Sequence, residues 1–95
     1  MRRIEWTEAA SLDLENVADE LDSYRSDLTD VVIARIYHAA LPLIDHPRLG
    51  PEVGTRGYRK WNARKTPFLL LYRVEGDRIL VGRVVHGLSD WQSIV

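Results

Sequence analysis

The sequence predicts an α+β fold in which a helical hairpin packs on one face of a curved sheet. Three observations predict it: alternating polar and apolar residues at 3–6, apolar residues at helical spacing between residues 8 and 44, and three strand-like segments after residue 57. The expected order is therefore an N-terminal strand, the hairpin, and a three-stranded antiparallel meander. The 95 residues are enough for a single domain spanning 1–95.

The first strand and the first helix follow directly from this pattern. Ile4 and Trp6 alternate with charged residues, so both should face the core. Thr7 is a good N-cap, and Glu8 places an acid in the first turn. The apolar positions of the helix are Ala10, Leu14, Val17, Ala18 and Leu21. Its polar face is acidic, with Asp13, Glu15, Asp19, Glu20 and Asp22.

A second helix should follow, capped by Ser26 or Asp27. Its apolar side contains Leu28, Val32, Ile33, Ile36, Tyr37, Ala40, Leu43 and Ile44. Pro42 lies inside this pattern, lacks an amide proton and clashes with the preceding turn, so a kink or break is expected at 38–42.

Residues 47–57 are rich in proline and glycine and predict an irregular connection. The strands of the meander should span 58–63, 68–74 and 79–86, with a tight turn at Gly76. Residues 68–72 are apolar at every position, which is typical of a central strand covered on both faces. The helices can cover only one face, so we expect something outside this chain to cover the other.

The residues that should be mostly buried come from all of these elements. They are Ile4, Trp6, Leu14, Val17, Leu21, Ile33, Ile36, Tyr37, Ile44, Leu70, Tyr72, Val81 and Val84.

Composition excludes several classes of protein. The chain has no cysteine, which rules out disulfides and thiolate metal sites. It has no apolar run long enough to cross a bilayer and no secretory signal, so we expect a cytoplasmic protein that does not contact a membrane. The net charge of −1 divides unevenly: four basic and ten acidic side chains lie in residues 1–47, against nine and four in 48–95. The basic half is the better candidate for contact with an anionic partner.

Residues 56–65 form a basic stretch with two aromatic residues interleaved. The cations are Arg56, Arg59, Lys60, Arg64 and Lys65, and the aromatic residues are Tyr58 and Trp61. This mixture suits an anionic protein or a nucleic acid, although a solvated edge strand would also carry it. On a strand, Arg59 and Trp61 would share one face and Lys60 the other.

A second group, Arg73, Arg83 and His86, could cleave RNA, with histidine as general acid and arginine stabilising phosphate charge. A regular hairpin turning at Gly76 would place Arg73 and His86 on one face and Arg83 on the other. A one-residue bulge would change this assignment. A hydrogen-bonded structural role for His86 is the alternative.

Metal binding is not expected. His38, His46 and His86 lie on separate predicted elements, and none has a second ligand at a suitable spacing. The sequence also has no glycine-rich phosphate loop or nucleophile elbow, so we expect no cofactor.

Several short stretches carry a family resemblance when taken in order. They are Trp6-Thr7, His46-Pro47-Arg48-Leu49-Gly50, Thr66-Pro67, Leu71-Tyr72-Arg73-Val74, Arg83-Val84-Val85-His86-Gly87 and Asp90-Trp91. Together with the predicted hairpin, they resemble the ParE/RelE toxins over nearly the whole chain. The resemblance implies the toxin of a type II toxin–antitoxin system, neutralised by an antitoxin that wraps around it in a complex of higher order.

The family has two activities, and the residues favour one of them. RelE-like toxins cleave messenger RNA on the ribosome and carry an arginine where this chain has Leu69, which can neither stabilise phosphate charge nor transfer a proton. The Thr-Pro, Tyr-Arg-Val and His-Gly stretches look more like ParE toxins, which poison DNA gyrase without being enzymes.

The resemblance therefore implies a gyrase inhibitor with no catalytic residue. Its expected partner-binding residues are Arg56, Arg59, Lys60, Trp61, Arg64, Lys65 and Trp91. The alternative is a ribosome-dependent mRNA endonuclease using His86, Arg83 and Arg73. A second alternative is an inactive interaction module that has kept the fold.

Overall fold

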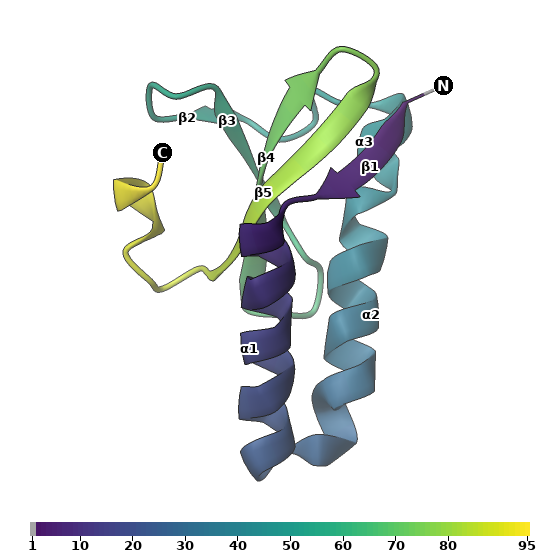
Figure 1. Cartoon of the computed structure of the whole chain (residues 1–95), viewed down its shortest axis with the longest axis vertical. Helices are drawn as coiled ribbons and strands as arrows, with labels where there is room; N and C mark the ends of the chain where they lie inside the picture. Colours follow the sequence, from purple (N-terminus) through teal and green to yellow (C-terminus); the bar gives the residue numbers. More distant parts are fainter. Residues whose placement is uncertain (1) are drawn as a thin grey trace.

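The computed structural model describes residues 2–95 and has the predicted α+β architecture (Figure 1). The strands are β1 (Arg3–Trp6), β2 (Glu52–Val53), β3 (Tyr58–Asn62), β4 (Phe68–Glu75) and β5 (Arg78–His86). The helices are α1 (Glu8–Tyr24), α2 (Thr29–Ala40) and α3 (Pro42–Asp45), with short 3-10 turns at Ser26–Leu28 (η1) and Trp91–Ser93 (η2).

The strands form one five-stranded mixed sheet in the order β1-β5-β4-β3-β2. The meander of β3, β4 and β5 is antiparallel as predicted, and β1 joins it in parallel beside β5. One prediction for this region is wrong, because the supposedly irregular segment 47–57 contains β2. Glu52 and Val53 pair with Arg59 and Tyr58, which adds an edge strand that is too short to show alternation in the sequence.

The first helix begins as predicted. The Thr7 hydroxyl accepts a hydrogen bond from the Ala10 N–H at 3.0 Å and so caps α1. The buried stripe of α1 consists of Ala10, Leu14, Val17 and Leu21. These side chains pack against the sheet, which places the helical hairpin on one of its faces.

The start of α2 differs from the prediction, because neither Ser26 nor Asp27 caps it. Both lie in η1, where Asp27 pairs with Arg25 at 3.1 Å. The hairpin is closed instead by the Thr29 hydroxyl, which donates to the Asp22 carboxylate at the end of α1. The break at Pro42 is confirmed: α2 ends at Ala40, and the separate helix α3 begins at Pro42.

The main core lies between the hairpin and the sheet. Of the predicted core residues, those that are buried are Leu14, Val17, Leu21, Ile36, Leu70, Tyr72, Val81 and Val84. Ile4, Trp6 and Ile33 pack against the margin of this core, and Ile44 is also half-buried. The prediction for Tyr37 is wrong, since its side chain is 46% exposed and meets Trp6 edge to face. The buried stripe of α2 runs through Val32, Ile36 and Ala40, one position away from Tyr37.

The central strand β4 is covered on both faces, as predicted, but the cover of its second face comes from this chain. A second cluster there contains Leu69, Leu71, Val85 and Trp91, with Val53, Tyr58, Ile94 and Val95 packed around it. The expectation of an outside cover is therefore wrong. The chain turns after β5 and lays its C-terminal residues over the sheet face opposite the helices.

Hydrogen bonds to its backbone carbonyls hold this C-terminal tail (residues 88–95) in place. The Thr55 N–H donates to the Val95 carbonyl at 3.1 Å, and the Arg56 guanidinium donates to the Ile94 carbonyl at 3.2 Å. Gly54 has φ +65°, and a side chain there would collide with the Val95 carbonyl. The loop before β3 is thus shaped to receive the tail.

Tyr72 ties the sheet to the loop that follows α3. Its buried hydroxyl donates to the Pro47 carbonyl at 2.7 Å and accepts from the Gly50 N–H at 3.0 Å. We expect Tyr72→Phe to lower the free energy of unfolding by about 1–2 kcal/mol, because both backbone groups lose their partner. Urea unfolding at neutral pH would measure this loss.

Alkaline pH provides a second test of the same hydroxyl. Burial raises the pKa of Tyr72 above its ordinary value of 10.0, so the folded state holds the proton more tightly than the unfolded state. This contribution to stability is complete below pH 10 and is lost as the pH rises through the raised pKa. Because phenylalanine has no hydroxyl to titrate, we expect Tyr72→Phe to lose less stability than the parent protein as the pH rises above 10. Equal losses of stability in both proteins would contradict the assignment.

Candidate functional site

The candidate nuclease residues are placed by an irregularity in the β4–β5 hairpin. The turn at Gly76 is as predicted, and Arg73 pairs with Leu80. A bulge then shifts the register between Leu71 and Tyr72, so that Arg83 pairs with Leu71 rather than Leu70. The extra residue on β5 is Gly82.

This bulge changes which residues share a face. Arg83, paired with Leu71, lies with Arg73 on the face covered by the tail. His86 pairs with Phe68, which packs against the core beneath the helices, so His86 lies on the opposite face. The prediction that Arg73 and His86 share one face is therefore wrong, and the bulge is the reason.

Arg83 is bound by the first helix. Its Nε and Nη2 donate to the two Asp13 carboxylate oxygens at 2.7 and 3.1 Å, and the Val84 N–H donates to the same carboxylate at 2.9 Å. β1 ends at Trp6, opposite Val81, and so does not extend along β5 as far as Val84. Asp13 therefore supplies the hydrogen-bond partner for the Val84 N–H at this edge of β5. The hydrogen bond with Asp13 raises the pKa of Arg83 above its ordinary value.

Arg73 and Tyr58 form a stacked pair on the same face. The Arg73 guanidinium carbon lies 4.2 Å from the centre of the Tyr58 ring, and the Arg73 Nε is buried without a hydrogen-bond partner among residues 2–95. The Tyr58 ring also lies over Gly82, where an added Cβ would approach it to 3.0 Å. A glycine at the bulge therefore leaves room for this ring.

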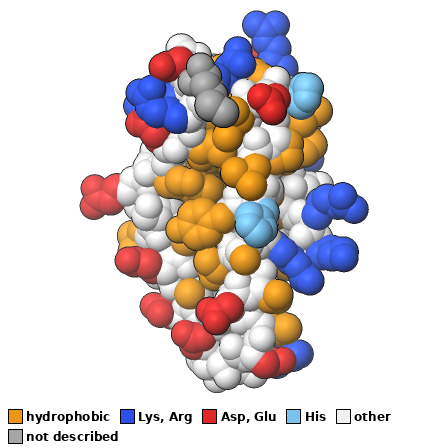
Figure 2. All heavy atoms as spheres, turned by 90° about the vertical axis from the view of Figure 1, so that its right-hand side faces the viewer, with side chains coloured by type: hydrophobic (Ala, Val, Ile, Leu, Met, Phe, Trp, Pro, Cys, Tyr) orange, Lys and Arg blue, Asp and Glu red, His pale blue; other side chains and the backbone are white. Residues whose placement is uncertain are grey.

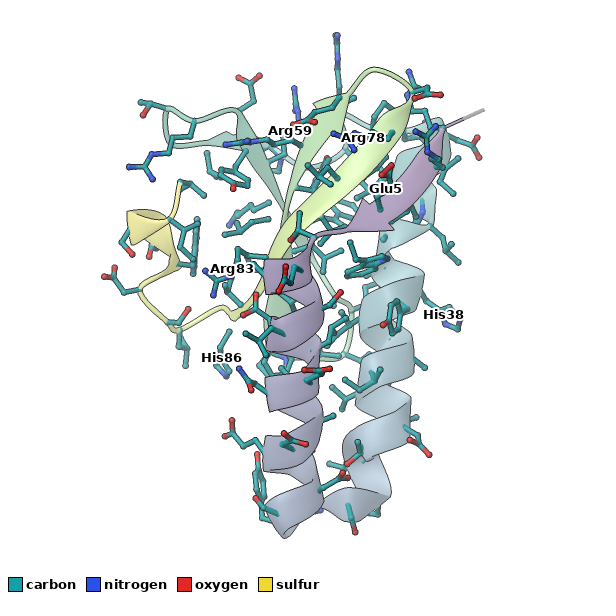
Figure 3. All side chains as sticks on the ribbon, viewed as in Figure 1. Glu5, His38, Arg59, Arg78, Arg83 and His86 are labelled. Atoms are coloured by element: carbon teal, nitrogen blue, oxygen red, sulfur yellow. The ribbon has the colours of Figure 1, made fainter. Side chains whose placement is uncertain are left out.

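His86 is held at the end of β5. Its Nδ1 accepts a hydrogen bond from the Leu88 N–H at 3.0 Å, and its ring meets Phe68 edge to face at 5.6 Å between centroids. Figure 3 shows Arg83 and His86 near α1 and His38 projecting from the outer side of α2. Within the described residues, no three His, Asp or Glu side chains gather as a metal site, and no helix is long and apolar enough to span a membrane.

The basic stretch is divided between the two faces of β3, as its alternation predicts. Arg59 and Trp61 lie on the helix face, where Arg59 donates to the Gly50 carbonyl at 2.8 Å and the Trp61 indole donates to the Ala39 carbonyl at 2.9 Å. Lys60 lies on the tail face, with its Nζ 5.6 Å from the centre of the Trp91 ring. These three side chains therefore have contacts within the chain.

The exposed cations lie at the two ends of β3. Arg56 precedes the strand and holds the tail, whereas Arg64 and Lys65 follow the strand in the turn to β4. Neither Arg64 nor Lys65 forms an ion pair with a carboxylate in the part of the chain that the structure describes. Trp91 is only 9% exposed and belongs to the second cluster.

Sequence reasoning missed two residues that organise these surfaces. The first is Asp13, which the sequence pattern places on the acidic face of α1. In the structure Asp13 lies between Ala10 and Leu14 on the buried side of the helix, and its spacing from these two residues is the feature of the sequence that could have identified it. Arg35 on α2 donates to the Lys65 carbonyl at 3.3 Å and so joins the basic turn. In the sequence Arg35 stands next to Ile36, which is buried, and this position is the feature that could have identified Arg35.

Comparisons with known proteins agree with this architecture. Residues 4–91 match the family described as the ParE toxin of the type II toxin–antitoxin system parDE. No match was found among curated proteins.

Several solved structures with the same fold align with most of this chain. The chromosomal ParDE system of Pseudomonas aeruginosa is 22% identical, with a TM-score of 0.81, and the alignment covers 90% of this chain and 96% of that one. The RelBE2 complex of Mycobacterium tuberculosis is 21% identical, with a TM-score of 0.64 and the same coverage. YafQ of Escherichia coli is 16% identical, with a TM-score of 0.58, covering 90% and 93%.

The family match extends from β1 through Trp91 and so includes all five strands and both long helices. The chain belongs to the ParE toxin family of type II toxin–antitoxin systems.

Proposed function

We propose that this toxin arrests growth by poisoning DNA gyrase, that it does so without catalysing a reaction, and that its cognate antitoxin neutralises it in a complex of higher order. The observation that carries the proposal is that the candidate nuclease groups do not form one free site. RNA cleavage needs proton-transfer groups and a stabiliser of phosphate charge around one scissile bond. Here the strand register places His86 on one face of the sheet and both arginines on the other. Arg83 and His86 both line a hollow of about 330 Å³ at the end of β5, but there the Arg83 guanidinium is paired with Asp13.

The arginines are also engaged elsewhere. The Arg83 guanidinium is neutralised by Asp13, and the Arg73 guanidinium lies against Tyr58. Leu69, at the position where the RelE-like branch carries an arginine, is 5% exposed in the second cluster. None of these side chains is ready to bind a phosphate. The net charge of −1 also gives little general attraction for ribosomal RNA.

The proposed contact surface for gyrase is the basic strand with the tail that lies against it. Arg56, Arg64 and Lys65 offer exposed charge at its ends, while Arg59, Lys60 and Trp61 form the strand between them. Trp91 is buried and contributes to this surface by anchoring the tail to the sheet. This surface would bind a protein rather than perform chemistry.

Purified toxin should inhibit supercoiling of relaxed plasmid by gyrase at micromolar concentration, and added antitoxin should restore it. The expected signature is linear plasmid from cleaved complexes that are not religated. Toxin with His86→Ala should be as potent as the parent, because His86 takes no part. Circular dichroism would verify that each sample is folded. A folded toxin that leaves supercoiling unchanged would refute the proposal.

The second candidate is a ribosome-dependent mRNA endonuclease. It is favoured by the bulge, which brings Arg73 and Arg83 to one face, where either could approach a phosphate if its present partner were displaced. Under this alternative, His86→Ala would abolish toxicity and expression of the parent would stop translation while DNA stays intact.

A chain that does not slow growth but still binds the antitoxin would be an interaction module.

A further inference from the structure

The ends of α1 and α2 that are joined by η1 extend beyond the sheet (Figure 1). A hollow with a volume of about 420 Å³ lies between these ends of α1 and α2 and the start of β4. Its walls include Leu21, Leu28, Val32 and Phe68. Tyr24 stands at the rim with 65% of its surface exposed. Such a hollow can hold a large apolar side chain.

A second hollow lies farther along α2. It has a volume of about 260 Å³ and is lined by Ala39, Pro42 and Trp61. The Trp61 indole N–H already donates to the Ala39 carbonyl, so the ring offers apolar surface rather than a hydrogen bond. Arg35 and Lys65 line both hollows and therefore stand between them.

The cations at this boundary have no acidic partner among the residues that the structure describes. Arg35, Arg64 and Lys65 form no ion pair with any carboxylate of residues 2–95. Arg35 donates only to the Lys65 carbonyl, and the side chains of Arg64 and Lys65 are exposed. Figure 2 shows the outer side of α2, where Lys and Arg side chains are more numerous along one edge of a hydrophobic band and Asp and Glu side chains along the other. This arrangement complements an acidic ligand with apolar side chains.

We propose that the two hollows and the cations between them bind an acidic segment of the antitoxin. Apolar side chains of that segment enter the hollows, and carboxylates between them meet Arg35, Arg64 and Lys65. A nucleic acid fits less well, because its evenly spaced phosphates would continue onto Glu20 at the rim and the acidic face of α1. A peptide can place few charges between two apolar anchors.

This inference rests on the antitoxin partnership alone and not on gyrase as the target. It also gives a physical account of neutralisation. Arg64 and Lys65 belong to the surface proposed for gyrase, so an antitoxin segment lying on them would exclude the target.

The test measures binding of fluorescently labelled full-length antitoxin to toxin variants between 50 and 300 mM salt. The test variant is R64E/K65E, whose side chains are both exposed. The matched control is R2E/R48E, which makes the same change of charge at exposed residues outside both hollows. R64E/K65E should weaken binding tenfold or more and flatten its dependence on salt, while the control stays within about twofold.

The apolar part of the proposal has its own variant. Tyr24→Ala should weaken antitoxin binding severalfold, by a factor that does not change with salt, because the lost contact is apolar. If R64E/K65E binds antitoxin as tightly as R2E/R48E, the proposal is wrong. It is also wrong if R64E/K65E loses only binding to a labelled single-stranded RNA. Failure of the supercoiling assay would leave these binding results unaffected, so the two proposals fail separately.

Discussion

Replacing Trp91 with alanine is expected to lower the free energy of unfolding by about 3–5 kcal/mol. Trp91 is 9% exposed and is the largest side chain of the cluster on the second face of the sheet, where it covers Leu69, Leu71 and Val85. Its removal opens a cavity and frees the tail, which exposes the central strand to water. A chain of this size has only about 5–15 kcal/mol of stability in total.

Urea unfolding followed by circular dichroism would measure this loss. Leu88→Ala is the matched control, since Leu88 lies in the same C-terminal segment but is 92% exposed, and it should change the midpoint little. If both variants unfold at the same urea concentration, the tail is not packed on the sheet. Bound antitoxin should raise the stability of the Trp91→Ala protein, because a ligand of the native state shifts the equilibrium.

Asp13→Ala is expected to lower the free energy of unfolding by about 2–4 kcal/mol, the second largest loss of stability. The change removes two hydrogen bonds from Arg83 and one from the Val84 N–H. Asp13 is largely buried, with 15% of its side chain exposed, whereas Arg83 is 36% exposed and its freed charge is partly solvated. The estimate is therefore lower than for a fully buried ion pair.

Asp13→Asn separates the two contributions. Asparagine keeps an oxygen that can accept from the Val84 N–H but loses the charge that pairs with Arg83, so it should be less damaging than alanine. A double-mutant cycle with Arg83→Ala would give the coupling between the two side chains. A coupling near zero would contradict the role assigned to the pair.

Local patterns were enough to predict most of the elements. The Thr7 cap, the buried stripe of α1, the break at Pro42 and the turn at Gly76 each depend on residues within a few positions of one another. The family was also visible in the order of short motifs. The cap predicted for α2 failed because the hydroxyl of Thr29 bonds to Asp22, seven residues away across the interhelical turn.

The candidate site was less predictable, because it depends on register. The alternation of residues along β3 correctly predicted that Arg59 and Lys60 lie on opposite faces of the sheet. The same reasoning failed on β5, where the extra residue at Gly82 exchanges the faces of every residue after it. A glycine in a strand is consistent with a bulge, but its position was fixed only by the partner strand and by the Tyr58 ring above it.

The sequence by itself determined the fold class, the order of the elements, the unequal charge of the two halves and the family resemblance, because these follow from composition, short-range periodicity and motif order. Only the tertiary structure decided that the tail covers the second face of the sheet, that Asp13 binds Arg83, and that the register of β5 places His86 and both arginines on opposite faces. The physical reason is distance along the chain. These contacts join segments far apart in sequence, and strand register and the competition for buried surface select them only when the whole chain has folded.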